Sequence, residues 1–225
     1  METNADEHFD KLRGQMVADI AAHTVFACAE IGKAALGARV MEAMGRVPRH
    51  EFVPAEIREY AYADTPLPIG RGQTISQPYI VAFMAEALRL HGGERVLEVG
   101  SGSGYAAAVL SLLAKEVYGI ELEAELYERS VATVGALGYA NVHLRHGDGF
   151  AGWPEKAPFD AILLSCAAED IPPPLWEQLA PGGRFLYPRG PAGGFQELVL
   201  VTKTSDGPRQ QRLAPVQFVP MRRAR

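Results

Sequence analysis

Residues 96–105 constrain this chain more than any other segment. They read VLEVGSGSGY: a short apolar run containing Glu98 is followed by glycines at positions 100, 102 and 104. Glycine reaches positive φ without steric cost and lets a ligand approach bare backbone. Residues 106–114 have a helical pattern, so the segment predicts a strand, a tight turn and a helix. This order is typical of the opening of a nucleotide-binding βα unit.

The spacing of the glycines separates two kinds of ligand. The dinucleotide fingerprint is G-x-G-x-x-G, but here the third glycine comes one residue early and Tyr105 takes its place. Glu98 would repel a phosphate and attract a cation. The pattern Glu-x-Gly-x-Gly-x-Gly resembles motif I of class I methyltransferases, whose ligand S-adenosylmethionine carries an ammonium and a sulfonium but no phosphate. A nicotinamide dinucleotide and a glycine turn without a ligand remain the alternatives.

Strand and helix patterns alternate along the rest of the chain. After the strand at 95–99 we expect strands at 117–120, 141–145, 159–165, 184–187, 195–203 and 213–219, and helices at 122–135 and 171–179. Alternation of this kind predicts a parallel sheet with helices on both faces. The last two strands, joined by residues 205–208, should form an antiparallel hairpin. The expected fold is α/β, a Rossmann-like doubly wound seven-stranded sheet preceded by N-terminal helices.

The segments before this sheet are harder to assign. Residues 9–45 read as two or three helices, alanine-rich over 25–38, and we expect residues 1–45 to form a helical cap on a methyltransferase domain at 46–225. Residues 46–80 are dense in proline and glycine, which predicts a long ordered loop of the kind that often carries function. An amphipathic helix is expected over 79–91.

Composition excludes several classes of function. The net charge is -5, so a broad nucleic-acid surface is not expected. The N-terminus lacks the pattern of a signal peptide, and charged residues interrupt the apolar stretch 16–38, so we expect no membrane and a cytoplasmic setting. Cys28 and Cys166 are far apart and the histidines lack ligand spacing, so no disulfide and no metal are expected. The basic tail 221–225 reads as a solvated end.

Polar residues follow the predicted strands where these strands end. Glu121 closes the second strand, where an acid usually binds a ribose diol, although a surface acid opening a helix is the alternative. Asp148, between two glycines after the third strand, suits the amine of adenine, with a plain Asp-Gly turn as the alternative. Ser165 and Cys166 follow the fourth strand. Because the carboxyl ends of parallel strands share one edge, these residues should converge with the glycine turn.

The methyl acceptor is not evident from single residues. The (Asn/Asp)-Pro-Pro-(Tyr/Phe) element of amide and base N-methyltransferases is missing at 165–168. Cys166 is expected to be a small buried hydrophobe rather than a nucleophile. By residue type alone, Ser76 reads as the N-cap of the helix that opens with Gln77 and Pro78.

Several segments together resemble the protein-L-isoaspartate O-methyltransferase family. They are VPRHEFVP at 47–54, residues 62–70, QTISQPY at 73–79, residues 98–105, GDG at 147–149 and FVP at 218–220. The resemblance runs from about residue 46 to 221, and its Thr-Ile-Ser-x-Pro element is peculiar to the family. It implies transfer of a methyl group from S-adenosylmethionine to the α-carboxylate of L-isoaspartyl residues in damaged proteins, the first step of their repair.

The resemblance also implies roles for particular residues. Ser76 is the expected catalytic residue. The expected donor-binding residues are Thr74, Ile75, Ser76, Glu98, Gly100, Ser101, Gly102, Gly104, Glu121, Leu122, Asp148 and Gly149. The expected substrate-binding residues are Pro68, Ile69, Val219 and Pro220.

The implied partners are isoaspartyl-containing proteins and peptides, bound by a monomer. Three alternatives stay open. The alanine-rich N-terminal stretch departs from the family pattern, which leaves room for a carboxyl methyltransferase dedicated to one precursor peptide. The others are a donor-binding module without turnover and an NAD-binding oxidoreductase.

Overall fold

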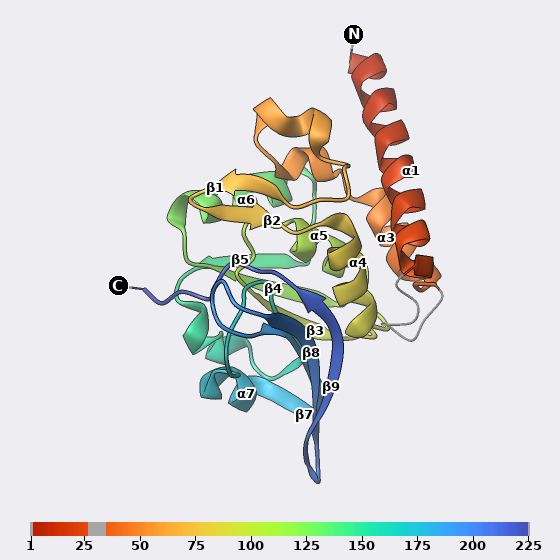
Figure 1. Cartoon of the computed structure of the whole chain (residues 1–225). Helices are drawn as coiled ribbons and strands as arrows, with labels where there is room; N and C mark the ends of the chain where they lie inside the picture. Colours follow the sequence, from red (N-terminus) through yellow and green to blue (C-terminus); the bar gives the residue numbers. More distant parts are fainter. Residues whose placement is uncertain (1, 27–34, 225) are drawn as a thin grey trace.

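A computed structural model describes residues 2–26 and 35–224, with side chains from residue 7 onward. A seven-stranded sheet runs through the molecule in the order β5-β4-β3-β6-β7-β8-β9 (Figure 1). The first five strands in this order, β5, β4, β3, β6 and β7, are parallel to one another. Strand β8 is antiparallel to β7, and β9 is antiparallel to β8. The strands are β3 Arg95–Val99, β4 Glu116–Glu121, β5 Val142–His146, β6 Phe159–Leu164, β7 Leu179–Arg189, β8 Gln196–Thr204 and β9 Gly207–Val216. The predicted doubly wound sheet with a terminal hairpin is confirmed.

The helices cover both faces of this sheet. The α-helices are α1 Glu2–Phe26, α3 Ala38–Arg46, α4 Pro78–Ala87, α5 Tyr105–Ser111, α6 Ala124–Ala136 and α7 Pro173–Gln178. Short 3-10 helices are η1 Arg49–Phe52, η2 Ala55–Tyr60, η3 Gly149–Ala151 and η4 Pro154–Lys156. Among the described helices, none is both long and apolar enough to cross a membrane.

Side chains of successive strand residues point to opposite faces of the sheet, so they pack into two separate hydrophobic cores. Val96 and Ala161 face the side covered by α1, α3, α4, α5 and α6. Leu97 and Ile162, their neighbours in sequence, face the side covered by α7. Full burial of such aliphatic side chains contributes about 1.5–3 kcal/mol each, so both layers hold the strands of the central sheet in place.

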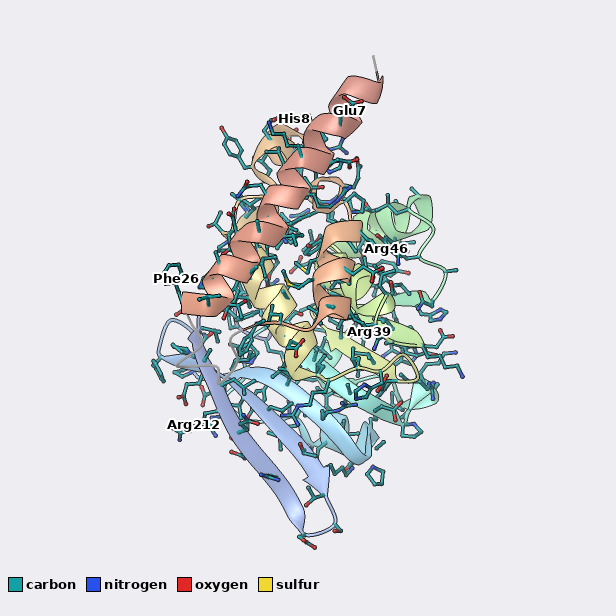
Figure 2. All side chains as sticks on the ribbon, turned by 90° about the vertical axis from the view of Figure 1, so that its right-hand side faces the viewer. Glu7, His8, Phe26, Arg39, Arg46 and Arg212 are labelled. Carbon is teal, nitrogen blue, oxygen red and sulfur yellow. The ribbon has the colours of Figure 1, made fainter. Side chains whose placement is uncertain are left out.

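The N-terminal helices form an outer layer on α4. Figures 1 and 2 show α1 and α3 side by side over α4. Met16 and Ile20 of α1 and Met44 of α3 are fully buried. Residues 27–34, with Cys28 and much of the alanine-rich stretch, lie outside the described residues. The division into a cap at 1–45 and a domain at 46–225 stays a prediction.

Helix α4 differs from its predicted amphipathic character. Val81, Ala82 and Ala85 are buried together with Phe83 and Met84, so buried residues are not confined to one face, and the helix ends at Ala87 rather than at residue 91. The reason is tertiary, since α1 and α3 pack on α4 from outside while α5 packs beside it. A helix covered on several sides has no solvent-exposed face, so the spacing of its apolar residues does not predict which of them are buried.

Two strand boundaries were also wrong in the sequence prediction. Strand β9 begins at Gly207 instead of 213, because residues 208–212 are polar and exposed on the edge of the sheet and so show no apolar alternation. Strand β7 begins at Leu179 instead of 184, and the Pro-Gly-Gly sequence at 181–183 lies within it beside an irregularity in the register with β6.

The predicted long loop over 46–80 is more regular than expected. It contains η1, η2 and a two-stranded antiparallel hairpin, β1 Leu67–Gly70 and β2 Gln73–Ile75. The hairpin turns at Arg71 and Gly72, both at positive φ. Strands of three and four residues carry too little pattern to predict from sequence, yet this hairpin leads the chain directly to Ser76.

Candidate active site

The glycine turn after β3 has the backbone that its sequence requires. Gly100, Gly102 and Gly104 have φ values of 80°, 54° and 86°, a region that costs a side-chain-bearing residue steric strain. The turn is closed by a hydrogen bond of 2.8 Å from the amide of Gly104 to the carbonyl of Ser101. A Cβ at Gly102 would stand 3.2 Å from the Ile69 side chain, so the turn also fits tightly against β1.

Glu121 connects this turn to the end of β4. Its buried carboxylate accepts hydrogen bonds from the amide of Gly102 at 2.7 Å and from the amide of Glu123 at 2.9 Å. A carboxylate has about four acceptor positions, so two remain after these bonds. Glu121 and Leu122 line a small cavity together with Gly149 and Cys166. The predicted convergence of the strand ends is therefore present for these residues.

Glu98 is buried at the end of β3 beside the same turn. Its Oε1 accepts a hydrogen bond of 2.7 Å from the Ser165 hydroxyl. Burial, with a smaller contribution from the charge of Glu121, raises the pKa of Glu98 to about 8, and the Ser165 hydrogen bond opposes this shift. Within the described residues, Oε2 of Glu98 and Oγ of Ser101 are buried without a hydrogen-bond partner. These two atoms can accept hydrogen bonds from a ligand, above all from a cationic one.

Ser76 lies where two cavities meet. One cavity contains Glu98, Ser101 and Gly102 of the donor turn. The other, of about 460 Å³, is a cleft between residues 66–77 and residues 215–219. Thr74, Ser76 and Ser165 line both. A group bound in the cleft would therefore reach a ligand on the glycine turn beside Ser76.

Ser76 does not cap α4, so that interpretation was wrong. The N-cap residue is Gln77, and it makes no side-chain cap hydrogen bond. The helix is capped from a distance instead: Asp64 Oδ1 accepts from the amide of Tyr79 at 2.8 Å, and Oδ2 accepts from the Gln77 side chain at 2.9 Å. His23 of α1 approaches the same Oδ2 at 3.0 Å. Asp64 therefore takes the capping role, and Ser76 lines the cleft instead.

Comparison with known proteins identifies the family. The model of the family described as Protein-L-isoaspartate(D-aspartate) O-methyltransferase (PCMT) matches residues 27–225. A protein-L-isoaspartate O-methyltransferase 2 from Anaeromyxobacter sp. (strain Fw109-5) is 72% identical over 185 residues, which cover 82% of this chain and 76% of the relative. The chain belongs to the protein-L-isoaspartate O-methyltransferase family. The methyl donor of this family is S-adenosylmethionine.

Two solved structures of similar fold agree with this assignment. The structure of a protein-L-isoaspartate O-methyltransferase matches with a TM-score of 0.80 at 28% identity. The match covers 92% of this chain and 65% of that chain. A Plasmodium falciparum protein, solved in complex with S-adenosyl-L-homocysteine, has a TM-score of 0.73 at 25% identity and covers 92% of this chain and 98% of that one. In the Plasmodium falciparum structure the demethylated donor is thus bound to a protein of this fold.

The residues present fit the donor of this family. The buried partnerless oxygens of Glu98 and Ser101 suit an ammonium, and Glu121 keeps free acceptor positions for hydroxyl groups. Among the described residues, the only cationic side chain that lines either small cavity is Arg222, which is paired with Glu123. This donor set favours a cationic ligand over a dinucleotide, as the glycine spacing predicted.

Asp148 accepts hydrogen bonds from two backbone amides at the end of β5, and its expected role toward adenine stays a prediction. Its Oδ1 accepts from the amide of Phe150 at 2.9 Å, which is the contact of a plain turn. Its Oδ2 receives a weak hydrogen bond of 3.3 Å from the amide of Ala224. Asp148 lines a neighbouring cavity of about 680 Å³ rather than the one lined by Glu121, although Gly149 does line the latter.

The four residues expected to bind substrate lie in different surroundings. Val219 and Pro220 line the cavities beside the turn, where Ala167 donates a hydrogen bond of 2.8 Å to the Val219 carbonyl. Pro68 is exposed in the hairpin, and Ile69 is fully buried against Gly102. Side chains alternate between the two faces of β1, so Pro68 and Ile69 point in opposite directions, and Ile69 packs against the glycine turn.

The C-terminal tail is closer to the site than the sequence suggested. Residues 222–224 are exposed, in line with the expected solvated end, but Arg222 also donates a hydrogen bond of 2.7 Å to Glu123, and the guanidinium of Arg223 lies 4.2 Å from the ring centre of Phe150. Met221 and Arg222 line the cavity of Glu121. The composition of the tail could not predict these contacts, because the acidic residues that pair with the tail lie at the ends of strands distant in sequence.

Cys166 is buried next to Gly100, as predicted. Burial, together with the charges of Glu121 and Glu98, raises the pKa of its thiol to about 12. A thiol with such a pKa stays protonated at neutral pH, and the thiolate is the nucleophilic form. Cys166 therefore acts as an apolar wall of the cavity.

Proposed function

We propose that this protein transfers the methyl group of S-adenosylmethionine to the α-carboxylate of L-isoaspartyl residues in proteins and peptides. The observation that carries the proposal is the junction at Ser76, where a surface cleft meets the cavity of the glycine turn in a chain of this family. The donor would lie in the turn cavity and the acceptor in the cleft.

We assign the donor-binding roles as follows. Glu98 and Ser101 hold the ammonium through their partnerless oxygens, and Glu121 holds the ribose diol through its remaining acceptor positions. The glycine turn lets the donor lie against bare backbone. Leu122 and Cys166 provide apolar walls, and the Asp148–Gly149 turn lies at the far end for the adenine.

The reaction needs little from the protein beyond binding and orientation. When bound, S-adenosylmethionine supplies a methyl group on a cationic sulfur, and a carboxylate oxygen forms the new carbon–oxygen bond as the electron pair of the carbon–sulfur bond passes to sulfur. A substrate carboxyl has an ordinary pKa near 4 and is ionised at neutral pH, so no general base is required. Orientation of the reacting groups then becomes the main contribution of the protein.

Ser76 is the residue we assign to this orientation. Its hydroxyl lies at the junction and can donate a hydrogen bond to the carboxylate oxygen that is not attacking. Thr74 and Ser165 line the same junction from β2 and from the end of β6. The segment at 215–219 forms the opposite wall of the cleft, and Val219 also lines the cavity of Glu121.

A pair of matched peptides tests the proposal. The two share one sequence and differ only in an L-isoaspartyl or an L-aspartyl residue at one position, and labelled methyl transfer from S-adenosylmethionine is measured for each. We expect label in the isoaspartyl peptide alone. Equal labelling of both, or labelling that depends on one flanking sequence and ignores the isoaspartyl linkage, would contradict the proposal.

A further inference from the structure

Arg49 is the largest fully buried side chain among the described residues. It lies on η1, in the segment before the donor turn, and none of the assigned donor or substrate roles uses it. Within the described part of the chain it forms no ion pair with a carboxylate, and burial lowers its pKa. A buried guanidinium without an anionic partner is costly, so its contacts need a reason.

Those contacts join three segments that are distant in sequence. Arg49 Nε donates a hydrogen bond of 2.7 Å to the carbonyl of Ala61, and Nη2 donates one of 2.8 Å to the carbonyl of Ser76. Its guanidinium carbon lies 4.7 Å from the ring centre of Tyr105. Tyr105 directly follows Gly104, so this ring is fixed to the donor turn.

The contact with Ser76 is the informative one. Ser76 follows the short strand β2, does not cap α4, and has its carbonyl held by Arg49. The same guanidinium packs on the first residue after the glycine turn. Arg49 therefore sets the distance between the backbone of Ser76 and the turn that would hold the donor.

We propose that Arg49 is a positioning residue for methyl transfer, which aligns the Ser76 hydroxyl with the donor without touching either substrate. The proposal rests on the function proposed above. A planar guanidinium suits this task because its donors are fixed in one plane, whereas a lysine ammonium donates from a single point. Alignment errors of about 1 Å at a reacting centre can cost about 100-fold in rate.

The test compares Arg49→Lys and Arg49→Met with the unchanged protein and with Arg39→Met. Arg39 of α3, labelled in Figure 2, is a matched control because it also donates to two backbone carbonyls, those of Leu90 and Leu113, away from the junction. Calorimetric titration with S-adenosyl-L-homocysteine counts the folded, binding-competent fraction. The kcat and KM for an isoaspartyl peptide are then expressed per competent site.

We expect both Arg49 variants to bind S-adenosyl-L-homocysteine within about threefold of the unchanged protein while kcat falls by at least tenfold, more for methionine than for lysine. Arg39→Met should keep its kcat per competent site. A kcat per competent site that stays unchanged in both Arg49 variants would overturn the proposal and reduce Arg49 to a structural role. Failure of the unchanged protein to methylate the peptide would instead refute the proposed function.

If neither Arg49 variant folds, a second measurement on the unchanged protein tests the proposal. In the unchanged protein with labelled arginine side chains, the Nη signals of Arg49 should show slow rotation, and they should shift when isoaspartyl peptide is added to the complex with S-adenosyl-L-homocysteine. The aspartyl twin should not shift them. Freely rotating Nη groups, or signals that ignore the isoaspartyl peptide, would overturn the proposal.

Discussion

The hydroxyl of Ser165, just after β6, donates a hydrogen bond of 2.7 Å to the buried carboxylate of Glu98 in the neighbouring strand β3. These strands are neighbours in the sheet, but the chain crosses to opposite sides between them, which makes this the switch point of the fold. One Glu98 oxygen is thus fixed and the other is left for a ligand. The pairing explains why a buried acid can precede the donor turn.

The raised pKa of Glu98 predicts that donor binding is linked to proton release. Because the pKa is about 8 without ligand, Glu98 is mostly protonated at pH 6–7, and an ammonium beside Oε2 favours its ionised form. The affinity for S-adenosyl-L-homocysteine should therefore rise as pH rises from 6 towards 8. Calorimetry in two buffers of different ionisation enthalpy should detect the released proton, and Glu98→Gln should abolish it. An affinity that is flat over this range would remove Glu98 from the ammonium site.

The same pKa shift has a consequence for stability without ligand. The folded-state pKa lies above the ordinary value of 4.5, so this group stabilises the fold most at low pH and loses that contribution as pH rises through 8. Thermal melting of Glu98→Gln should lack this loss. Other titrating groups change both proteins alike, so the difference between the two melting curves is the relevant quantity.

Replacement of Ser76 by alanine should lower turnover without weakening donor binding. A hydrogen bond to a charged group contributes about 1.5–3 kcal/mol, so kcat should fall by about 10- to 100-fold. The Kd for S-adenosyl-L-homocysteine should stay within about twofold. Ser111→Ala is the control, since the Ser111 hydroxyl is buried within α5, where it donates to the carbonyl of Ala108. Retention of full turnover by Ser76→Ala would refute the role of Ser76.

Replacement of Glu121 by alanine should weaken donor binding. The variant loses acceptor positions for the ribose and the bond that fixes Gly102, and a charge-assisted hydrogen bond contributes about 1–3 kcal/mol. The measurement is titration with S-adenosyl-L-homocysteine. Glu116→Ala provides the comparison, because Glu116 starts the same strand and pairs with His143 far from the turn. If both variants bind equally well, Glu121 does not hold the donor.

Arg222→Ala should speed the release of S-adenosyl-L-homocysteine. The tail residues Met221 and Arg222 wall the cavity of Glu121, and the Arg222–Glu123 pair fastens them there. Exposed pairs contribute about 0.2–1 kcal/mol, so the dissociation rate should rise no more than about fivefold. Arg212→Ala is the control, since Arg212 pairs with Glu197 on the outer hairpin (Figure 2). A dissociation rate that matches the control would separate the tail from donor release.

The sequence was informative where local pattern and structure share a cause. The glycines at 100, 102 and 104 occupy backbone that favours glycine, and the apolar runs from β3 to β7 became parallel strands of one sheet. Glu121 could be placed at the turn because parallel strands end at one edge. These inferences needed only the chain's own periodicity and the geometry of a parallel sheet.

The sequence was misleading where a distant residue takes over a local role. Ser76 has the residue type and position of an N-cap, yet Asp64 performs the capping. Ile69 belongs to a recognisable motif and was expected to bind substrate, but side chains alternate along the short strand β1, and that of Ile69 is buried in the core. Arg49 could be quoted as part of a motif, while its contacts with Ser76 and Tyr105 follow only from the tertiary fold.

The most direct test of the account follows the fate of the transferred methyl group. An L-isoaspartyl peptide is incubated with the protein and S-adenosylmethionine and monitored by mass spectrometry over time. An α-carboxylate ester should form first, lose its methyl group by closing to a succinimide, and then yield some of the normal aspartyl peptide. A methylated peptide that stays stable, or one in which the methyl group resides on nitrogen or on another side chain, would contradict methyl transfer to the α-carboxylate.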